Sequence, residues 1–221
     1  MRLGYKIGMR LRALACALGL FVALGCGDDA SNPDEGNEEE LITTVNLTFT
    51  PMGGGTAVVA SFNDSDGDGG EAPTIDDIEL VTASNYTLAI EFLNELESPA
   101  EDITEEIEEE AEEHQIFITG DVDGPASDSA APLVSHSYAD VESDYGPNSE
   151  GDDLPVGLSN DIAGVSAGTG TLTLTLRHLP EVNGTAVKVA SLADDAASGG
   201  IASLPGDSDV SIDFNLTVVA P

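Results

Sequence analysis

Basic residues are scarce in this chain and are concentrated at one end. The 221 residues include 42 acidic and only 6 basic side chains, and four of the basic ones lie in the first dozen positions. From residue 26 onward only Arg177 and Lys188 remain against all 42 acids, so that part carries a formal net charge of −40. A surface of this charge makes nucleic acid and anionic lipid poor partners.

The excess of carboxylates needs a compensating agent. At about one uncompensated negative charge per five residues, self-repulsion destabilises a compact chain. Salt weakens the repulsion, because the Debye length falls to about 3 Å at 1 M, and carboxylate clusters can also hold divalent cations such as calcium. Little lysine and acids in nearly every loop are typical of proteins from halophiles. We therefore expect salt screening, with bound calcium as a compatible alternative.

Cysteine is nearly absent, and both copies lie near the N-terminus. A basic segment ends at Arg12, an apolar run extends over 13–24, and Gly25 and Cys26 follow. A charged segment, a short apolar segment and a small residue before the cleavage point are typical of a secretory signal peptide. Because Cys26 comes directly after that small residue, we expect a lipoprotein: residues 1–25 are removed and Cys26 is acylated.

The segment that follows the predicted cleavage point is a tether. Residues 26–40 are acidic and contain no large apolar side chain, which predicts disorder. Gly27 favours sorting to the outer membrane, where the lipid would anchor the protein facing the periplasm or the cell surface. Cys16 is the competing acylation site, although only three apolar residues lead into it. Acylation of Cys26 leaves no thiol for an intramolecular disulfide.

Residues 41–221 show the period-two alternation of half-buried strands. The clearest segments lie at 44–49, 86–92, 172–178 and 210–218. Weaker candidates lie at 56–62, 115–119, 133–138, 156–158 and 185–190. Eight or nine short strands predict one all-β domain, an antiparallel β-sandwich of immunoglobulin-like or cadherin-like type.

The acidic segment 100–114 is the exception to the strand pattern. Ile103, Ile107, Ala111 and His114 fall on one stripe of a helix. Like charges four residues apart oppose that helix by about 0.2–0.5 kcal/mol per pair. We expect one short helix of one to three turns, with its acidic faces in solvent.

A calcium-binding loop is predicted in the sequence DSDGDGGE. Asp64, Asp66 and Asp68 stand at positions 1, 3 and 5 with glycine at position 6, as in the first half of an EF-hand loop. The second half is missing, since Ile75 occupies the position of the bidentate glutamate. The alternative is an acidic, glycine-rich turn without an ion.

A second acidic turn repeats this spacing less closely, with Asp140, Glu142 and Asp144. Two such turns in one all-β protein favour connections that calcium stabilises. The alternative here is again a solvated turn.

Residues with catalytic potential are scarce. The chain has three histidines, with no pair four residues apart. His178 ends a predicted strand and is expected to be a half-buried structural residue. His136 lies between two serines without a nucleophile elbow, and no spacing singles out a pair of acids for glycoside hydrolysis. We therefore expect no enzymatic activity.

Several short motifs occur together along the predicted domain. They are DSDGDGGEAP at 64–73, FLNE at 92–95, PAEDITEEI at 99–107, EHQ at 113–115 and GTGTLT at 168–173. In this combination the chain resembles, from about Leu41 to Val219, a group of small Gram-negative lipoproteins of unknown function. Members are often labelled type 1 periplasmic-binding-fold proteins. That label implies a two-lobed α/β protein, whereas the length and the lack of alternating helices favour the all-β fold. The acidic insertion at 145–153 departs from the group.

We expect a non-catalytic, lipid-anchored protein with a binding or envelope-structural role. One alternative is a solute-binding lipoprotein that serves a transporter, which needs a deep cleft, although the chain has no tryptophan and few aromatic residues. A second alternative is an extracytoplasmic hydrolase, which needs a nucleophile with its base or a convergent pair of acids.

Overall fold

A computed structural model describes residues 40–67, 69–148 and 151–221, which form two β-sheets and two α-helices. The strands are β1 (Thr44–Pro51), β2 (Val58–Asn63), β3 (Thr74–Ile75), β4 (Ile78–Val81), β5 (Asn85–Asn94), β6 (Glu101–Asp102), β7 (His114–Gly120), β8 (Val122–Gly124), β9 (Ser127–Asp128), β10 (Val134–Tyr138), β11 (Ser159–Gly164), β12 (Gly168–His178) and β13 (Asp207–Val219). The helices are α1 (Ile103–Glu109) and α2 (Leu192–Gly199), with the short 3₁₀ helices η1 (Glu142–Asp144) and η2 (Ile201–Ser203). None of the helices described is long and apolar enough to cross a membrane.

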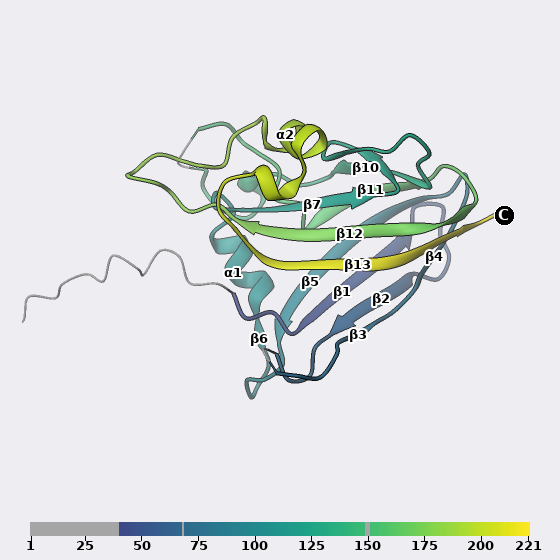
Figure 1. Cartoon of the computed structure of the whole chain (residues 1–221), viewed down its shortest axis with the longest axis horizontal. Coiled ribbons are helices and arrows are strands. Elements are labelled where there is room, and N and C mark those ends of the chain that lie inside the picture. The colour runs from purple at the N-terminus through teal and green to yellow at the C-terminus, as the bar shows by residue number, and fades with distance from the viewer. Residues whose placement is uncertain (1–39, 68, 149–150) are drawn as a thin grey trace, which may run out of the picture. The chain divides into compact units, whose positions relative to one another are not determined.

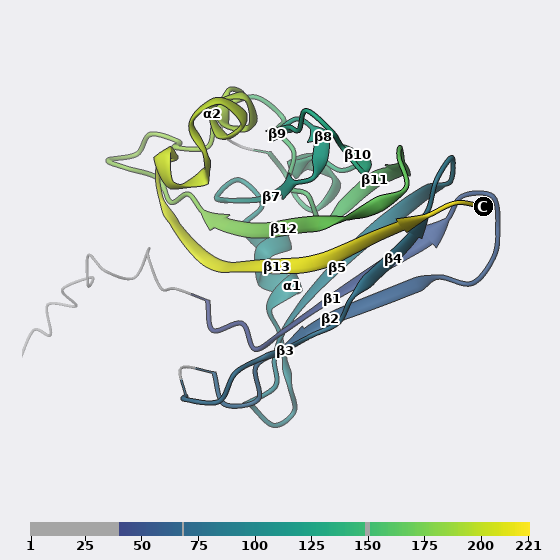
Figure 2. The same cartoon turned by 45° about the vertical axis from the view of Figure 1, so that its right-hand side comes forward.

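The larger sheet has the strand order β3-β2-β1-β5-β11-β10-β8-β9, with β6 paired to β5, and the smaller sheet has the order β4-β13-β12-β7. Figures 1 and 2 show β7, β12 and β13 as a layer beside the layer of β1, β2 and β5. Most pairs are antiparallel, as expected. The prediction of a purely antiparallel arrangement was wrong in two places, because β8 pairs with β10 and β4 pairs with β13 in parallel.

One hydrophobic core joins the inward faces of the two sheets. Alternation along β1 and β5 buries Leu47, Phe49 and Leu88 completely, and alternation along β12 and β13 does the same for Leu174 and Phe214. Each large apolar side chain buried in this way stabilises the fold by about 1.5–3 kcal/mol.

Strand β7 is buried on both faces. Ile116 and Ile118 point into the core between the sheets, whereas Phe117 packs with Leu192 and Ala196 of α2 on the opposite face. Both views show α2 over the outer side of β7. The two layers of packing fix β7, whose first residue belongs to the site described below.

The clearest strand predictions were confirmed as β1, β5, β12 and β13, and three weaker ones as β2, β7 and β10. The predicted strands at 156–158 and 185–190 were wrong. Val156 and Leu158 are buried, but their carbonyls accept single hydrogen bonds from Ile116 and Ile90 instead of forming a ladder. In the segment 185–190, the side chain of Lys188 is buried in an ion pair with Glu142, and the segment forms no strand.

The helix prediction was wrong in number and in the placement of His114 on the helix, whereas α1, with seven residues, has the predicted length of one to three turns. Helix α1 ends at Glu109, and His114 already belongs to β7. The second helix, α2, was missed because its sequence LADDAASG has no long apolar stripe: only Leu192 and Ala196 are buried. Its helical state therefore depends on packing against β7, which a local pattern does not reveal.

Candidate functional site

A cavity of about 220 Å³ lies between the C-terminal end of α1 and the loop that follows β12. Six of its lining residues are glutamates: Glu109, Glu110, Glu112, Glu113, Glu142 and Glu181. Since water occupies about 30 Å³ per molecule in the liquid, the volume suits a hydrated ion. Pockets that hold drug-sized ligands are larger, at about 300–1,000 Å³.

Helix α1 sets the position of the glutamate run. Its first turn is capped by Asp102, which accepts a hydrogen bond from the Thr104 N–H at 3.1 Å. The helix ends where the Glu110 N–H donates to the Glu106 carbonyl, and the Glu113 N–H then donates to the Glu110 carbonyl. The last turn of α1 contains no basic residue. Carboxylates at this negative end of the helix dipole strengthen the negative potential of the cavity.

Lys188 forms a buried ion pair at the cavity wall. Its Nζ lies 2.8 Å from Glu142 Oε1 and donates to the Ala111 carbonyl at 2.7 Å. The two side chains are only 1% and 3% exposed. Burial lowers the pKa of Lys188, and Glu142 opposes that change. Arg177 is buried as well, so the exposed surface of the described residues carries neither lysine nor arginine.

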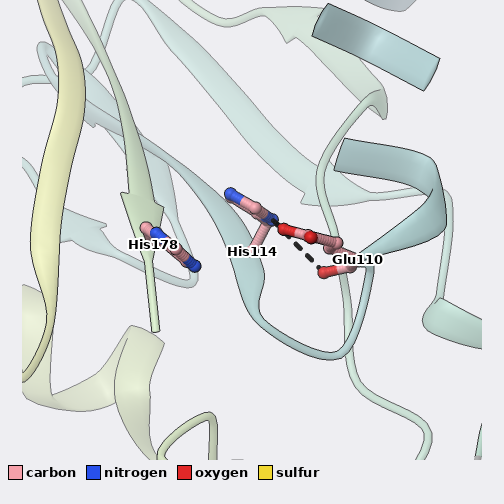
Figure 3. Close-up of side chains that lie close together, drawn as sticks. All are labelled: Glu110, His114 and His178. Carbon is pink, nitrogen blue, oxygen red and sulfur yellow. Dashed lines mark hydrogen bonds and ion pairs between the residues drawn. The ribbon is translucent and has the colours of Figure 1, made fainter. Parts of the chain in front are cut away.

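His114 and His178 form a stacked pair, and Glu110 lies close to His114 (Figure 3). They lie opposite each other in the β7–β12 register, with ring centroids 4.6 Å apart and an interplanar angle of 9°. Both are buried, at 0% and 5% exposure. Glu110 Oε2 lies 4.0 Å from His114 Nδ1, and Glu113 Oε2 lies 3.7 Å from His178 Nε2. These two glutamates therefore connect the cavity with the histidine pair.

The hydrogen bonds of His114 define its neutral tautomer. Its Nδ1 lies 3.2 Å from the Glu110 carbonyl, which can only accept, so Nδ1 carries the proton and Nε2 keeps its lone pair. This Nε2 is buried and has no hydrogen-bond partner. Burial, followed by the charge of His178, lowers the pKa of His114 to about 4. His114 is therefore neutral at pH 7.

The carboxylates near the site raise one another's pKa. Burial raises the pKa of Glu110, and the negative charges of Glu113, Glu106 and Glu109 add to this, while His178 opposes it. Burial also raises the pKa of Glu40 to about 7, together with a hydrogen bond and repulsion from Glu106. Burial and like charge therefore both disfavour full ionisation of these carboxylates.

Replacing Glu40 with glutamine should raise the melting temperature above pH 7 and leave it unchanged below pH 4.5. A folded-state pKa of about 7, above the ordinary 4.5, means that the native state binds more protons between these values. Wild type therefore loses stability as the pH rises through this window, whereas glutamine does not titrate. Thermal melts from pH 4 to 8 test this, and a gain of equal size at pH 4 would refute the electrostatic cause.

The predicted calcium loop lies between β2 and β3. Asp64 and Asp66 are partly buried, and Asp68 lies outside the described residues. Gly67 has a φ of +58°, which glycine adopts without strain. Asp66 Oδ2 accepts a hydrogen bond from the Glu71 N–H at 3.2 Å. The Oδ1 atoms of Asp64 and Asp66 are shielded from solvent and have no hydrogen-bond partner.

The carboxylates of the second acidic turn each bind separate protein groups. Asp140 accepts hydrogen bonds from Tyr145 Oη, Gly157 N and Ser159 N at 2.7, 2.8 and 2.9 Å. Glu142 pairs with Lys188, and Asp144 accepts from the Val141 N–H. Within the described ranges, the cluster whose three ligand atoms lie within 4.8 Å of one another is Glu110, His114 and His178.

Sequence reasoning missed the pairing of His114 with His178. His114 was assigned to the end of a helix, and His178 was expected to be half-buried, although it is 5% exposed. In the sequence, each of the two histidines stands at one end of an apolar strand segment. That the two residues pair is visible only from the register between β7 and β12. The predicted lipid attachment at Cys26 and the signal peptide lie outside the described residues.

Comparison of the chain with known protein families, curated proteins and solved structures found no match.

Proposed function

We propose that the chain is a non-catalytic binding protein, anchored to the outer membrane through Cys26, that holds a cation in the glutamate-lined cavity. The observation that carries this proposal is the cavity of about 220 Å³ with six glutamates in its wall. Its one lysine, Lys188, is already paired with Glu142 and leaves the remaining charge in excess.

Electrostatics favour a cation over any other occupant. Burial and repulsion between neighbouring carboxylates raise the pKa of Glu110, and a bound cation offsets both by stabilising the charged form. An anion would add to the repulsion, and an apolar ligand would leave the carboxylates partly desolvated without a counter-charge. The cavity volume suits a hydrated metal ion or a very small organic cation.

The fold type belongs to the same proposal. We assign the two sheets to a β-sandwich of immunoglobulin-like or cadherin-like type. The shared core and the predominance of antiparallel pairs support this assignment.

The cation site is tested by calorimetric titration with calcium and zinc in molar NaCl, where non-specific attraction to the acidic surface is screened. We expect saturable binding for wild type. The variant Glu109→Gln/Glu181→Gln, which changes two cavity residues, should bind about tenfold more weakly or worse, because affinity follows the number of ligand charges.

The matched control is Glu79→Gln/Glu97→Gln, which removes the same charge from exposed positions outside the cavity. The control should bind as wild type does. Equal weakening in both variants, or no saturable binding at all, would refute the cavity as the site.

Replacing Cys26 with serine should abolish lipid labelling and move the protein from the membrane to the soluble fraction. The thioether-linked lipid is the attachment that the sequence predicts, and serine cannot form it. Incorporation of labelled palmitate measures this directly. Cys16→Ser is the control and should keep its label; loss of the label in that variant instead would assign the anchor to Cys16.

We also propose calcium binding at the Asp64–Asp66–Asp68 loop, supported by the buried, unpartnered Oδ1 atoms of Asp64 and Asp66. Calcium added in molar NaCl should raise the melting temperature of wild type along a saturating curve. Asp66→Asn should lose the part of this gain that the loop contributes, whereas Glu79→Gln, with the same charge change, should keep the whole gain. If all three proteins respond equally, the loop is an acidic turn.

A further inference from the structure

We propose that His114, His178 and Glu110 bind one divalent transition ion of the zinc type, with Glu110 shared between this cluster and the cavity wall. The proposal deepens the proposed function and rests on it, because Glu110 belongs both to the cavity wall and to this cluster. It names the class of cation: zinc, cobalt, nickel or copper, in preference to calcium or magnesium.

The strand register builds this ligand set. His178 pairs directly with His114 at the ends of β12 and β7. Side chains of directly opposed residues on one face have Cβ atoms about 4.5–5.5 Å apart, which allows two imidazoles to share an ion. The turn after α1 adds Glu110, and one ligand atom from each of the three residues lies within 4.8 Å of the others.

The chemistry of the ligands selects the metal. Calcium and magnesium take oxygen ligands, whereas imidazole nitrogen suits zinc, copper and nickel. Two imidazoles with one carboxylate form a donor set found in zinc sites that keep a further position for water. The surrounding glutamates contribute long-range attraction for a divalent ion.

The second supporting observation is the hydrogen bonding of His114. Histidines that bind metals almost always donate their other ring N–H to a carboxylate or a backbone carbonyl. His114 donates Nδ1–H to the Glu110 carbonyl, and its buried Nε2 has no partner. A buried nitrogen lone pair without a donor is otherwise a penalty in a folded protein.

Binding requires a rearrangement, because the Glu110 carboxylate lies 4.0 Å from His114 Nδ1 and must move to reach an ion held at the unpartnered Nε2. An ion binds in the plane of an imidazole ring, and the two rings are stacked nearly parallel at 4.6 Å (Figure 3). One ring must therefore turn out of the stack. Zinc–nitrogen bonds of about 2.0–2.1 Å also require the ligand atoms to approach one another by about an ångström.

The test uses cobalt(II) as a spectroscopic probe on the full-length protein as processed by the expressing cell, after chelator treatment and in molar NaCl. We expect the visible absorption of cobalt to intensify and shift as imidazole nitrogen replaces water, and zinc to displace it at one equivalent. Because the rings unstack, the NMR ring-proton signals of both histidines should shift together on zinc addition.

The variants His114→Phe and His178→Phe keep a planar ring and should lose the cobalt spectrum. Outer-shell partners alone cost 10–100-fold in affinity, so loss of a ligand should weaken zinc binding by about 100-fold or more. His136→Gln, at the third histidine, should bind zinc as wild type does. Glu110→Gln should also weaken zinc binding. Because this side chain is 53% exposed, the substitution should not disturb folding, and it replaces a phenylalanine variant that fails to fold.

The outcomes separate the two proposals. Cobalt that keeps its hexaaqua-like spectrum, or zinc affinity that is equal in wild type and both histidine variants, overturns the histidine site. If calcium then still binds in a manner that depends on Glu109 and Glu181, the cation cavity stands. If neither metal binds wild type, both proposals fail.

Discussion

Replacing Lys188 with methionine should lower the free energy of unfolding by about 3–5 kcal/mol. The ammonium lies 2.8 Å from Glu142 Oε1, and both side chains are almost completely buried. Methionine fills similar space but leaves the Glu142 carboxylate buried without its counter-charge. Chemical denaturation in molar NaCl, followed by circular dichroism, measures the loss.

A second substitution separates charge from packing. Lys188→Met/Glu142→Gln removes both charges and lets the glutamine oxygen keep accepting from Asn148 Nδ2 and the Leu154 N–H. It should recover much of the loss, since a buried pair replaced as a whole is often close to neutral. A double-mutant cycle gives the coupling energy. If Lys188→Met costs less than about 1 kcal/mol, the pair is not closed to solvent as described.

Raising NaCl from about 10 mM to 1 M should increase the melting temperature by about 10 °C or more, because the Debye length falls from about 30 Å to about 3 Å. The part of the chain from residue 26 onward carries a formal charge of −40, and both of its basic side chains are buried. Among the described residues, no exposed lysine or arginine therefore weakens the repulsion between exposed carboxylates. For a chain of this size each kcal/mol gained shifts the melting temperature by about 2–4 °C.

The variant Glu79→Lys/Glu97→Lys/Asp161→Lys tests the cause. All three positions are exposed and lie outside the cavity. The variant should melt higher than wild type at low salt and respond less to NaCl. A melting temperature that stays flat with salt in wild type would show that packing, and not charge density, limits stability.

The strand framework was predictable because alternation is a local property. Leu47, Phe49, Leu174 and Phe214 are apolar at period two, and each is buried in the core. The excess of acidic residues was also evident from the composition. Short strands such as β4 and β8 were not predictable, since their pairing with β13 and β10 depends on segments far away in the chain.

The candidate site was not predictable for the same reason. The Lys188–Glu142 pair and the His114–His178 stack each join residues from distant segments. Carboxylates at regular local spacing pointed to the turns at Asp64 and at Asp140. In the structure Asp140 accepts three hydrogen bonds, one from the nearby Tyr145 and two from the more distant Gly157 and Ser159. The site is formed by side chains that meet in space, and their spacing along the chain does not reveal it.

Anomalous diffraction from crystals grown in molar NaCl and soaked with manganese(II) tests the occupancy of the cavity most directly. Manganese suits carboxylate ligands, so it reports on the glutamate-lined cavity. We expect an anomalous peak inside the cavity, within coordination distance of a Glu110 or Glu113 oxygen. Peaks confined to the outer surface or to the 64–71 loop, with the cavity empty, would contradict the proposal that this protein binds its cation there.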